Sequence, residues 1–322
     1  MMKIALLARA CDATATFKNE DNLGNLVFRI AIQNLIPHDF RFDWYQYNEM
    51  SECEADAFVV PLANCVRSGF KIKESLIEEW KKALRGRPLI GIGLGADAPF
   101  VDSQISLDPN TISWLELFSA LWTRGTYTSA ILAGYGIDST SGCCPSLFLT
   151  SNCPNYNDLS FSMSDIGVSP APSTIAGKKI NELLFSNARG DIFIQGPRRF
   201  LDYWKEGLIS KIIRELGLRD IDEDRLYLSF EFNRWVEALK EHKVIFSGRF
   251  HCASLAFNNS IPTVMLPLDL RTHELCETFN MPTFDYRTSE MITVPEFDEQ
   301  KFRENRFWKR IAFDKFLAYN GI

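Results

Sequence analysis

Arg249 and His251 stand two residues apart in the stretch VIFSGRFHCASLAFNNSIPTV (244–264), where an apolar run ends in Ser-Gly and a segment with helical spacing follows. This pattern predicts a strand that turns into a helix. The first turn of a helix offers free backbone N–H groups and a partial positive charge. Arginine adds a fork that holds a carboxylate or phosphate, and histidine changes charge near neutral pH. The pair therefore predicts a site for an anionic substrate that needs proton transfer. The alternative is a surface arginine beside a buried structural histidine.

A second cation follows the next predicted strand. In LDLRTHEL (268–275), Asp269 and Arg271 come directly after an apolar run, and a helix is expected from Glu274 onward. Ligands of parallel α/β sheets lie outside the carboxyl ends of the strands. Arg271 is therefore the candidate for a second anion-holding residue, with His273 as a weaker one.

Three further strand ends carry polar or small residues. NLGNLVF (22–28) places Asn22, Gly24 and Asn25 at the first turn from strand to helix, either as a polar-ligand site or as a simple helix cap. Asn64 follows the apolar run FVVPLA. GIGLGA (91–96) contains Gly95 and leads to Asp97. Because it lacks the glycine spacing of a dinucleotide fingerprint and does not follow the first strand, we interpret it as a turn that faces the cleft.

The elements that must position these residues alternate along the chain. In the first half, strands are expected at 3–8, 41–47, 56–62 and 88–94, and helices at 26–36, 73–84, 111–121 and 126–136. After a Pro-, Ser- and Asn-rich stretch at 143–162, strands are expected at 164–171, 191–196, 225–230, 243–247 and 262–268. Helices are expected at 176–188, 208–217, 233–242, 250–260 and 298–319. This alternation predicts the α/β class, with two Rossmann-like domains in tandem and a cleft between them.

Composition limits the classes of function. The chain has 322 residues, 46% of them hydrophobic, and a formal net charge of −6, which argues against a general nucleic-acid binder. Its eight cysteines form no C-x-x-C pair and have no histidine near their clusters, so we expect reduced thiols and no metal. No apolar run reaches the roughly 18 residues that a membrane span needs. We expect a cytoplasmic protein.

The ordered motifs resemble the polysaccharide pyruvyltransferase family. FSGRFHCASLAFNNSIPTVML is similar to its signature of a strand, S-x-R-hydrophobic-H and a small-residue helix. LDLRTHELCETFNMP, the NLGN turn, and TRGTYTSAILAGYGI followed by GCCPSLFL match other family segments in the correct order. The sequence departs from the usual pattern at Asn25, where an aspartate is more common, before Pro262, where a glycine is common, and in one extra cysteine.

The resemblance implies a GT-B arrangement and transfer of a pyruvyl group from phosphoenolpyruvate to a saccharide, with phosphate released and a ketal formed across two hydroxyls. Phosphoenolpyruvate is then the donor substrate, and no metal or bound cofactor is implied. The resemblance places Arg249 and His251 in the donor site, Arg271 where some relatives have a lysine, and Arg124 at an R-G position. Asp97 and Asp269 are the candidate bases for the sugar hydroxyl.

The implied organisation has an acceptor-side domain at 1–160, a donor-side domain at 161–296 and a final helix at 297–322 that returns to the first domain. The acceptor is a saccharide or a lipid-linked oligosaccharide of surface or capsular polysaccharide biosynthesis, with peripheral contact at the inner face of the membrane. Two alternatives stay open: a GT-B glycosyltransferase that uses a nucleotide sugar, and a non-catalytic relative that binds phosphate or sugar.

Overall fold

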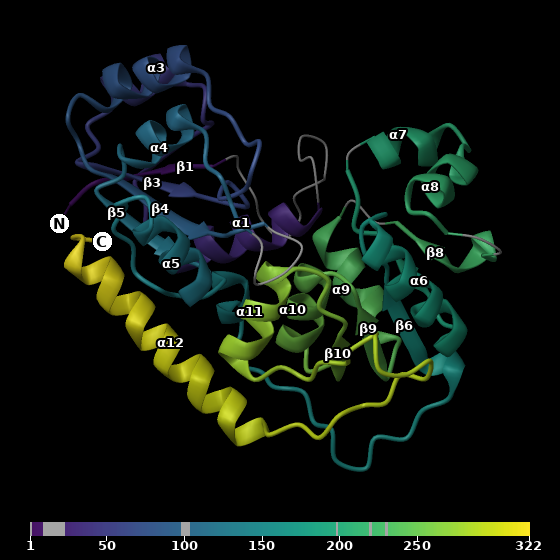
Figure 1. Cartoon of the computed structure of the whole chain (residues 1–322). Helices are drawn as coiled ribbons and strands as arrows, with labels where there is room; N and C mark the ends of the chain where they lie inside the picture. The colour runs from purple at the N-terminus through teal and green to yellow at the C-terminus, as the bar shows by residue number, and fades with distance from the viewer. Residues whose placement is uncertain (1, 9–22, 98–103, 198, 219–220, 229–230) are drawn as a thin grey trace.

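In the computed structural model, the protein folds into two parallel β-sheets, both flanked by helices (Figure 1). The structure describes residues 2–8, 23–97, 104–197, 199–218, 221–228 and 231–322. The strand order is β2-β1-β3-β4-β5 in the first sheet and β10-β9-β6-β7-β8 in the second, and all of these neighbours pair in parallel. The predicted fold, two Rossmann-like α/β units in a GT-B-like arrangement, is confirmed.

The first sheet and its helices come from the N-terminal half. Its strands are β1 (Ile4–Leu7), β2 (Phe40–Phe42), β3 (Ala57–Pro61), β4 (Leu89–Leu94) and β5 (Ala120–Thr123). Its helices are α1 (Leu23–Leu35), α2 (Tyr47–Glu52), α3 (Glu74–Leu84), α4 (Pro109–Leu115) and α5 (Thr126–Ala133). Strands β1, β3 and β4 are buried along their whole length, which explains why they read as continuous apolar runs.

The second sheet repeats this plan. Its strands are β6 (Ile166–Ser169), β7 (Ile192–Phe193), β8 (Leu226–Tyr227), β9 (Val244–Ser247) and β10 (Thr263–Met265). The helices are α6 (Ile175–Asn187), α7 (Arg199–Lys205), α8 (Ile209–Glu215), α9 (Phe232–Lys240), α10 (Phe250–Asn258), α11 (Leu270–Phe279) and α12 (Glu299–Tyr319), with short 3₁₀ turns η2 (Pro145–Phe148), η3 (Met163–Asp165) and η4 (Glu223–Arg225).

Two predicted elements of the first half are wrong in part. The helix expected at 111–121 ends at Leu115, and the chain then forms the edge strand β5, which begins beside β4 with Ser119 N–H donating to Leu89 O. A short buried apolar run does not distinguish strand from helix by its period, and this explains the error. The strand expected at 41–47 is observed only at Phe40–Phe42. Tyr47, the last residue of the predicted strand, is the first residue of α2.

The long helix α12 runs along one side of the molecule and contacts elements of both halves (Figure 1). Near its start, Phe302 packs on Phe257 of α10 with ring centroids 5.1 Å apart. Near its end, Phe313 meets Trp122 of β5 edge to face at 5.2 Å. Arg306 lies between them, 7% exposed, and donates to the carbonyls of Ser151 and Asn152. The helix therefore links the two sheets through an aromatic core.

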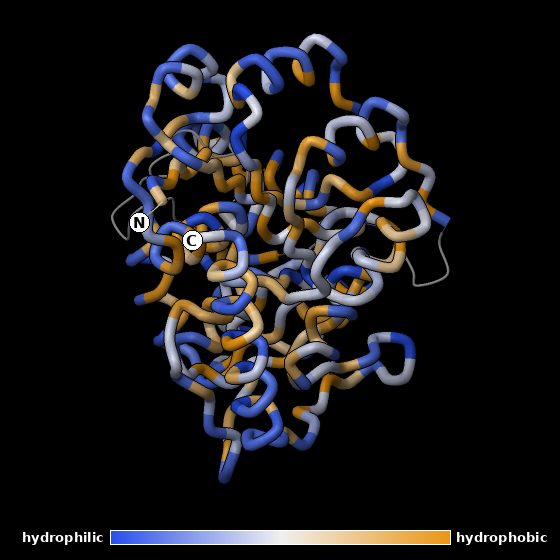
Figure 2. The backbone as a smooth tube through the Cα atoms, turned by 90° about the vertical axis from the view of Figure 1, so that its left-hand side faces the viewer, coloured by the Kyte–Doolittle hydropathy of each residue, from blue (hydrophilic) through white to orange (hydrophobic). Residues whose placement is uncertain are grey.

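Hydrophobic segments concentrate in the middle of the molecule, and hydrophilic ones dominate its outer turns (Figure 2). Among the helices of the described ranges, none combines the length and apolar character that a bilayer span requires.

Candidate active site

A cavity of about 1380 Å³ lies between the two sheets. Its walls come from both halves of the chain, and six of its polar side chains follow the carboxyl end of a strand: Asn64 after β3, Asp97 after β4, Arg124 after β5, Gln195 after β7, Arg249 after β9 and Asp269 after β10. This is the edge of a parallel sheet at which ligands bind. The predicted residues Arg124, Arg249, His251 and Arg271 all line this one cavity.

Arg249 is the residue that caps α10. Its extended backbone is held by Ser247, whose hydroxyl accepts from Arg249 N–H at 3.1 Å and donates to Arg249 O at 2.7 Å. The guanidinium Nε donates to Pro170 O at 3.1 Å, and within the described part of the chain its two terminal nitrogens make no further hydrogen bond, so they can bind a ligand. Withdrawal from water and the charge of Arg271 together lower the pKa of Arg249 to about 10, while Asp269 opposes the change. The group stays cationic at neutral pH.

His251 lies in the first turn of α10 and is 9% exposed. Its Nε2 is 3.8 Å from Cys144 Sγ, and its Nδ1 faces Gly24 on α1, where an added β-carbon would lie 2.6 Å away. Burial lowers the pKa of His251 well below its ordinary range, and Arg124, Arg271 and Arg249 lower it further. The imidazole is therefore neutral at pH 7 in the protein alone, so an acid role needs an anion nearby to restore the proton.

Arg124 is 1% exposed and follows β5 directly. Its Nη1 donates to Asn64 Oδ1 at 3.1 Å, and its guanidinium lies 5.0 Å from the centre of the Phe28 ring. Within the described residues, its Nε and Nη2 have no hydrogen-bond partner. Burial and the charge of Arg271 lower the pKa of Arg124, while Cys144 opposes the change. A buried cation with unmet donors is costly unless a ligand satisfies it, which marks an anion site.

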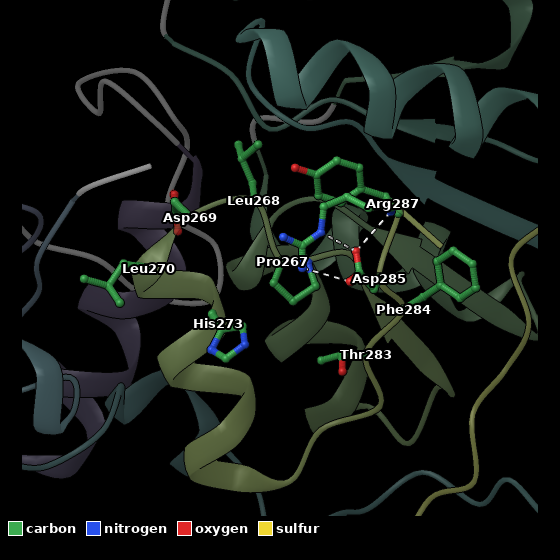
Figure 3. A pocket seen from close by; sticks show the side chains of 10 residues that line it. Pro267, Leu268, Asp269, Leu270, His273, Thr283, Phe284, Asp285 and Arg287 are labelled. Carbon is green, nitrogen blue, oxygen red and sulfur yellow. Dashed lines mark hydrogen bonds and ion pairs between the residues drawn. The ribbon is translucent and has the colours of Figure 1, made fainter. Parts of the chain in front are cut away.

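Arg271 belongs to α11 rather than to a loop before it. The helix begins at Leu270, four residues earlier than predicted, because Asp269 caps it by accepting from Thr272 N–H at 2.8 Å. Arg271 Nη2 lies 3.0 Å from Asp269 Oδ2. The carboxylate of Asp269 thus already interacts with Thr272 and Arg271, which makes it a weaker candidate for the base. His273 lies outside the main cavity, in a smaller hollow of about 140 Å³ beside Asp285 and Arg287 (Figure 3).

The candidates on the first sheet divide into two roles. Asn25 and Asp97 line the cavity, and Asp97 Oδ2 lies 3.8 Å from Arg67 at its half-exposed edge. Asn64 and Gly95 position Arg124. The side-chain oxygen of Asn64 accepts a hydrogen bond from it, and an added β-carbon on Gly95 would lie 3.0 Å from Arg124 Cδ, so Gly95 leaves space for that side chain. Asn22 lies outside the described residues.

The glycines of GIGLGA have a packing role. Gly93 has φ +81° at a register shift between β4 and β5, and a β-carbon there would lie 2.4 Å from the Phe28 ring. Phe28 in turn lies under Arg124. This segment therefore seats α1 against the sheet, and the nucleotide-binding interpretation finds no support in it.

Sequence reasoning missed several residues that line the cavity. Gln195 is 6% exposed and follows β7, and a polar residue directly after the apolar residues 192–194 was the available signal. Lys179 on α6 and Arg67 carry no such signal because they lie away from the strand ends. With them the cavity is lined by six cationic side chains and two carboxylates, although the whole chain carries −6: Arg67, Arg124, Lys179, Arg249, Arg271 and Arg287 against Asp97 and Asp269. The lining therefore favours an anionic ligand.

A metal centre is not evident in the part of the chain that the structure describes, where no three His, Cys, Asp or Glu side chains gather.

Several solved structures match the chain at low identity and with TM-scores below 0.5. They include a putative UDP-N-acetylglucosamine 2-epimerase from Listeria monocytogenes (10% identity, TM-score 0.42, covering 98% of this chain and 90% of that one). The UDP-GlcNAc 2-epimerase from Methanocaldococcus jannaschii gives 10% identity and a TM-score of 0.44, with 97% and 99% covered. An alpha-glucosyltransferase in complex with UDP gives 10% and 0.47, with 98% and 93% covered.

No curated protein matches the chain by sequence. A family model does: residues 26–269, from α1 to the cap of α11, match the one described as Polysaccharide pyruvyl transferase. The matched segment contains Arg124, Arg249 and His251, and it covers most of the chain. The protein is therefore a transferase enzyme and belongs to the polysaccharide pyruvyl transferase family.

Proposed function

We propose that the protein transfers the pyruvyl group of phosphoenolpyruvate to a saccharide and forms a ketal across two of its hydroxyls. The observation that carries this proposal is the convergence of Arg124, Arg249 and Arg271 around His251 in one cavity. Phosphoenolpyruvate carries a carboxylate and a phosphate, so its binding needs several cations at once. The unmet donors of the buried Arg124 fit such a ligand.

The proposed reaction begins with a proton. His251 donates it to the methylene carbon of phosphoenolpyruvate, which becomes a methyl group, and positive charge develops at C2. A sugar hydroxyl attacks C2 and gives up its proton, the bond from C2 to the phosphate oxygen breaks, and a second hydroxyl closes the ring. Of the two hydroxyl protons, one replaces the proton that His251 gave and the other leaves with phosphate. The arginines stabilise the carboxylate and the departing phosphate.

The acceptor side of the proposal rests on the first sheet. Asp97 is the carboxylate there that lines the cavity, and we assign it the role of base for the sugar hydroxyl. The division into an acceptor-side domain at 1–160, a donor-side domain at 161–296 and a final helix follows the same assignment. We place the reaction in the cytoplasm, at the inner face of the membrane, in surface or capsular polysaccharide biosynthesis.

The test is incubation with phosphoenolpyruvate and a panel of saccharides and lipid-linked oligosaccharides. The expected result is phosphate release that depends on the acceptor, together with the mass gain of one ketal. Nucleotide release from a sugar nucleotide without consumption of phosphoenolpyruvate would identify a glycosyltransferase instead. Binding of phosphoenolpyruvate without turnover on any acceptor would identify a non-catalytic relative.

Binding of phosphoenolpyruvate is expected to take up a proton. His251 is neutral at pH 7 in the free protein because its pKa is lowered by burial and by three arginines. The charges of the donor oppose those arginines and raise this pKa, so the complex holds more protons than its parts and the affinity rises as pH falls. Calorimetric titrations in two buffers of different ionisation enthalpy measure the uptake. It should shrink in a His251→Gln variant, and zero uptake in the wild type would contradict the loading of His251 by the donor.

A Gly24→Ala variant is expected to lose activity without loss of folding. The added β-carbon would lie 2.6 Å from His251 Nδ1 and 2.4 Å from Gln195 Nε2, so the imidazole must move. A displacement of this size is expected to lower kcat/KM by about 10- to 100-fold, while alanine favours the helix itself. Steady-state kinetics and thermal melting check both. Gly134→Ala, whose β-carbon meets no atom closer than 3.3 Å, is the control. Full activity of Gly24→Ala would contradict the prediction.

A further inference from the structure

Glu274 is a buried carboxylate that joins the two halves of the cavity wall. It lies on α11 and is 2% exposed. Its Oε1 accepts from the backbone N–H groups of Tyr127 at 2.5 Å and Thr128 at 3.3 Å, and its Oε2 accepts from Thr128 Oγ1 at 3.2 Å. Tyr127 and Thr128 belong to the first turn of α5, on the other sheet. One side chain thus connects a helix of each half.

This joint lies between two of the proposed donor-binding cations. Arg271 is three residues before Glu274, so the two share one face of α11 about one turn apart. Arg124 comes just before Gly125, the residue that caps α5. Through Glu274, the helix that carries Arg271 is therefore fastened to the turn that carries Arg124.

The surroundings of Glu274 are built closely around it. A β-carbon on Gly125 would lie 2.2 Å from Glu274 Cδ, so the carboxylate occupies the space that a larger residue would need. Thr128 is fully buried, and its hydroxyl also accepts from Ala96 N–H at 3.0 Å, which extends the network to the end of β4 beside Asp97. No ion pair is formed by Glu274 within the described ranges. Its charge is met by the N–H groups and positive end of α5.

The tether acts against a repulsion. Arg124 and Arg271 are like charges that line the same cavity, and Arg271 is one cause of the lowered pKa of Arg124. Without a ligand, like charges disfavour the close approach of the segments that carry them, although the pairing of Arg271 with Asp269 reduces this repulsion. The Glu274 carboxylate, which belongs to α11 and accepts hydrogen bonds from α5, opposes separation of the two helices before the donor binds. This preorganisation lowers the free-energy cost of ordering the site on binding.

We propose that Glu274 is a positioning residue, which joins α11 to α5 and thereby holds Arg124 and Arg271 at the separation that the donor anion needs. The inference rests on the proposed function, because phosphoenolpyruvate is the anion concerned. Glu274 itself does not line the cavity, so it acts through the two arginines.

Titration calorimetry with phosphoenolpyruvate tests the proposal in Glu274→Ala and Glu274→Gln. The alanine variant is expected to bind at least about tenfold more weakly with an unchanged number of sites, since the cations lose their preset geometry. The glutamine variant should stay within about threefold of the wild type, because its amide oxygen still accepts from Tyr127 and its amide group donates to Thr128 Oγ1. Asp298→Ala removes a helix-capping carboxylate at α12, away from the cavity, and should leave the affinity unchanged.

The outcomes separate the two proposals. Wild-type affinity in Glu274→Ala overturns the positioning role, and so does a loss of binding sites at unchanged affinity, which indicates a purely structural defect. If the wild type itself fails to bind phosphoenolpyruvate, the proposed function is wrong. Amide hydrogen exchange then tests separately whether Glu274 connects α11 to α5. Exchange at Tyr127 and Thr128 should be about tenfold or more faster in Glu274→Ala than in wild type and Glu274→Gln. Equal exchange in all three overturns the joint as well.

Discussion

A His251→Gln variant should bind phosphoenolpyruvate and yet turn it over about a thousandfold more slowly, within the range that loss of a general acid causes. Glutamine is neutral, as the imidazole is in the free protein, and it fills a similar space in the first turn of α10. The three arginines proposed to hold the anion are unchanged. The substitution therefore removes the proton donor from the reaction while the charges that bind the donor stay in place.

The split between binding and turnover is the decisive measurement. Phosphate release gives kcat, and calorimetry gives the dissociation constant for phosphoenolpyruvate. His273→Gln is the matched control, because that ring is exposed in the smaller hollow, paired with Glu277, and outside the main cavity. A His251→Gln enzyme that keeps more than about a tenth of the wild-type rate would contradict the acid role, given the size of that effect. Weakened binding with unchanged kcat would show instead that His251 only holds the anion.

The fold was predictable because its signals are local. Buried parallel strands such as β3 and β4 read as continuous apolar runs, and the helices between them show their own period. Where the prediction of secondary structure was wrong, the structure of the segment depends on a neighbouring element and not on its own sequence. The chain at Ala120–Thr123 becomes a strand because β4 offers it an unpaired edge, and no property of those residues alone reveals that edge.

The lining of the candidate site was predictable to the extent that it follows strand ends. Arg249, His251 and Arg271 were candidates because they come after apolar runs, the ordered motifs added Arg124, and all four line the cavity. The contacts that hold these residues and their helices in place were not predicted. Asn64 holds Arg124 from 60 positions away, and Glu274 reaches Tyr127 across 147 positions. Contacts over such separations depend on how the two sheets are placed, and a single sequence carries no periodic signal for that.

Arg124→Met is expected to have opposite effects on binding and on stability. Loss of a cation with at least two unmet donors should weaken phosphoenolpyruvate binding by about 100-fold or more, as removal of one member of a buried charge contact does. In the free protein, however, this guanidinium is buried, and its Nε and Nη2 are without partners among the described residues. Replacing it with an apolar side chain of similar length should raise the free energy of unfolding by about 1–3 kcal/mol.

A second buried arginine supplies the control. Arg306 is 7% exposed, but its guanidinium donates to the carbonyls of Ser151 and Asn152, so Arg306→Met should lower the free energy of unfolding by about 2–4 kcal/mol. Urea unfolding with and without phosphoenolpyruvate compares the variants. The donor should stabilise the wild type and Arg306→Met but not Arg124→Met. A loss of stability in both variants would mean that Arg124 is a structural residue whose donors are already satisfied.

The same variant should change the titration of His251. After burial, Arg124 is the largest cause that lowers the pKa of this imidazole. Its removal favours the charged ring, so the pKa should move up toward its ordinary value near 6.5, and NMR titration of the ring protons can follow it. A raised pKa of His251 together with lost phosphoenolpyruvate binding would show that Arg124 affects both the protonation of His251 and the binding of the donor. It would then add to the effect of burial in keeping His251 neutral before the donor binds, and it would hold the anion whose arrival gives the ring its proton. An unchanged pKa would place Arg124 too far from the ring to exert that control.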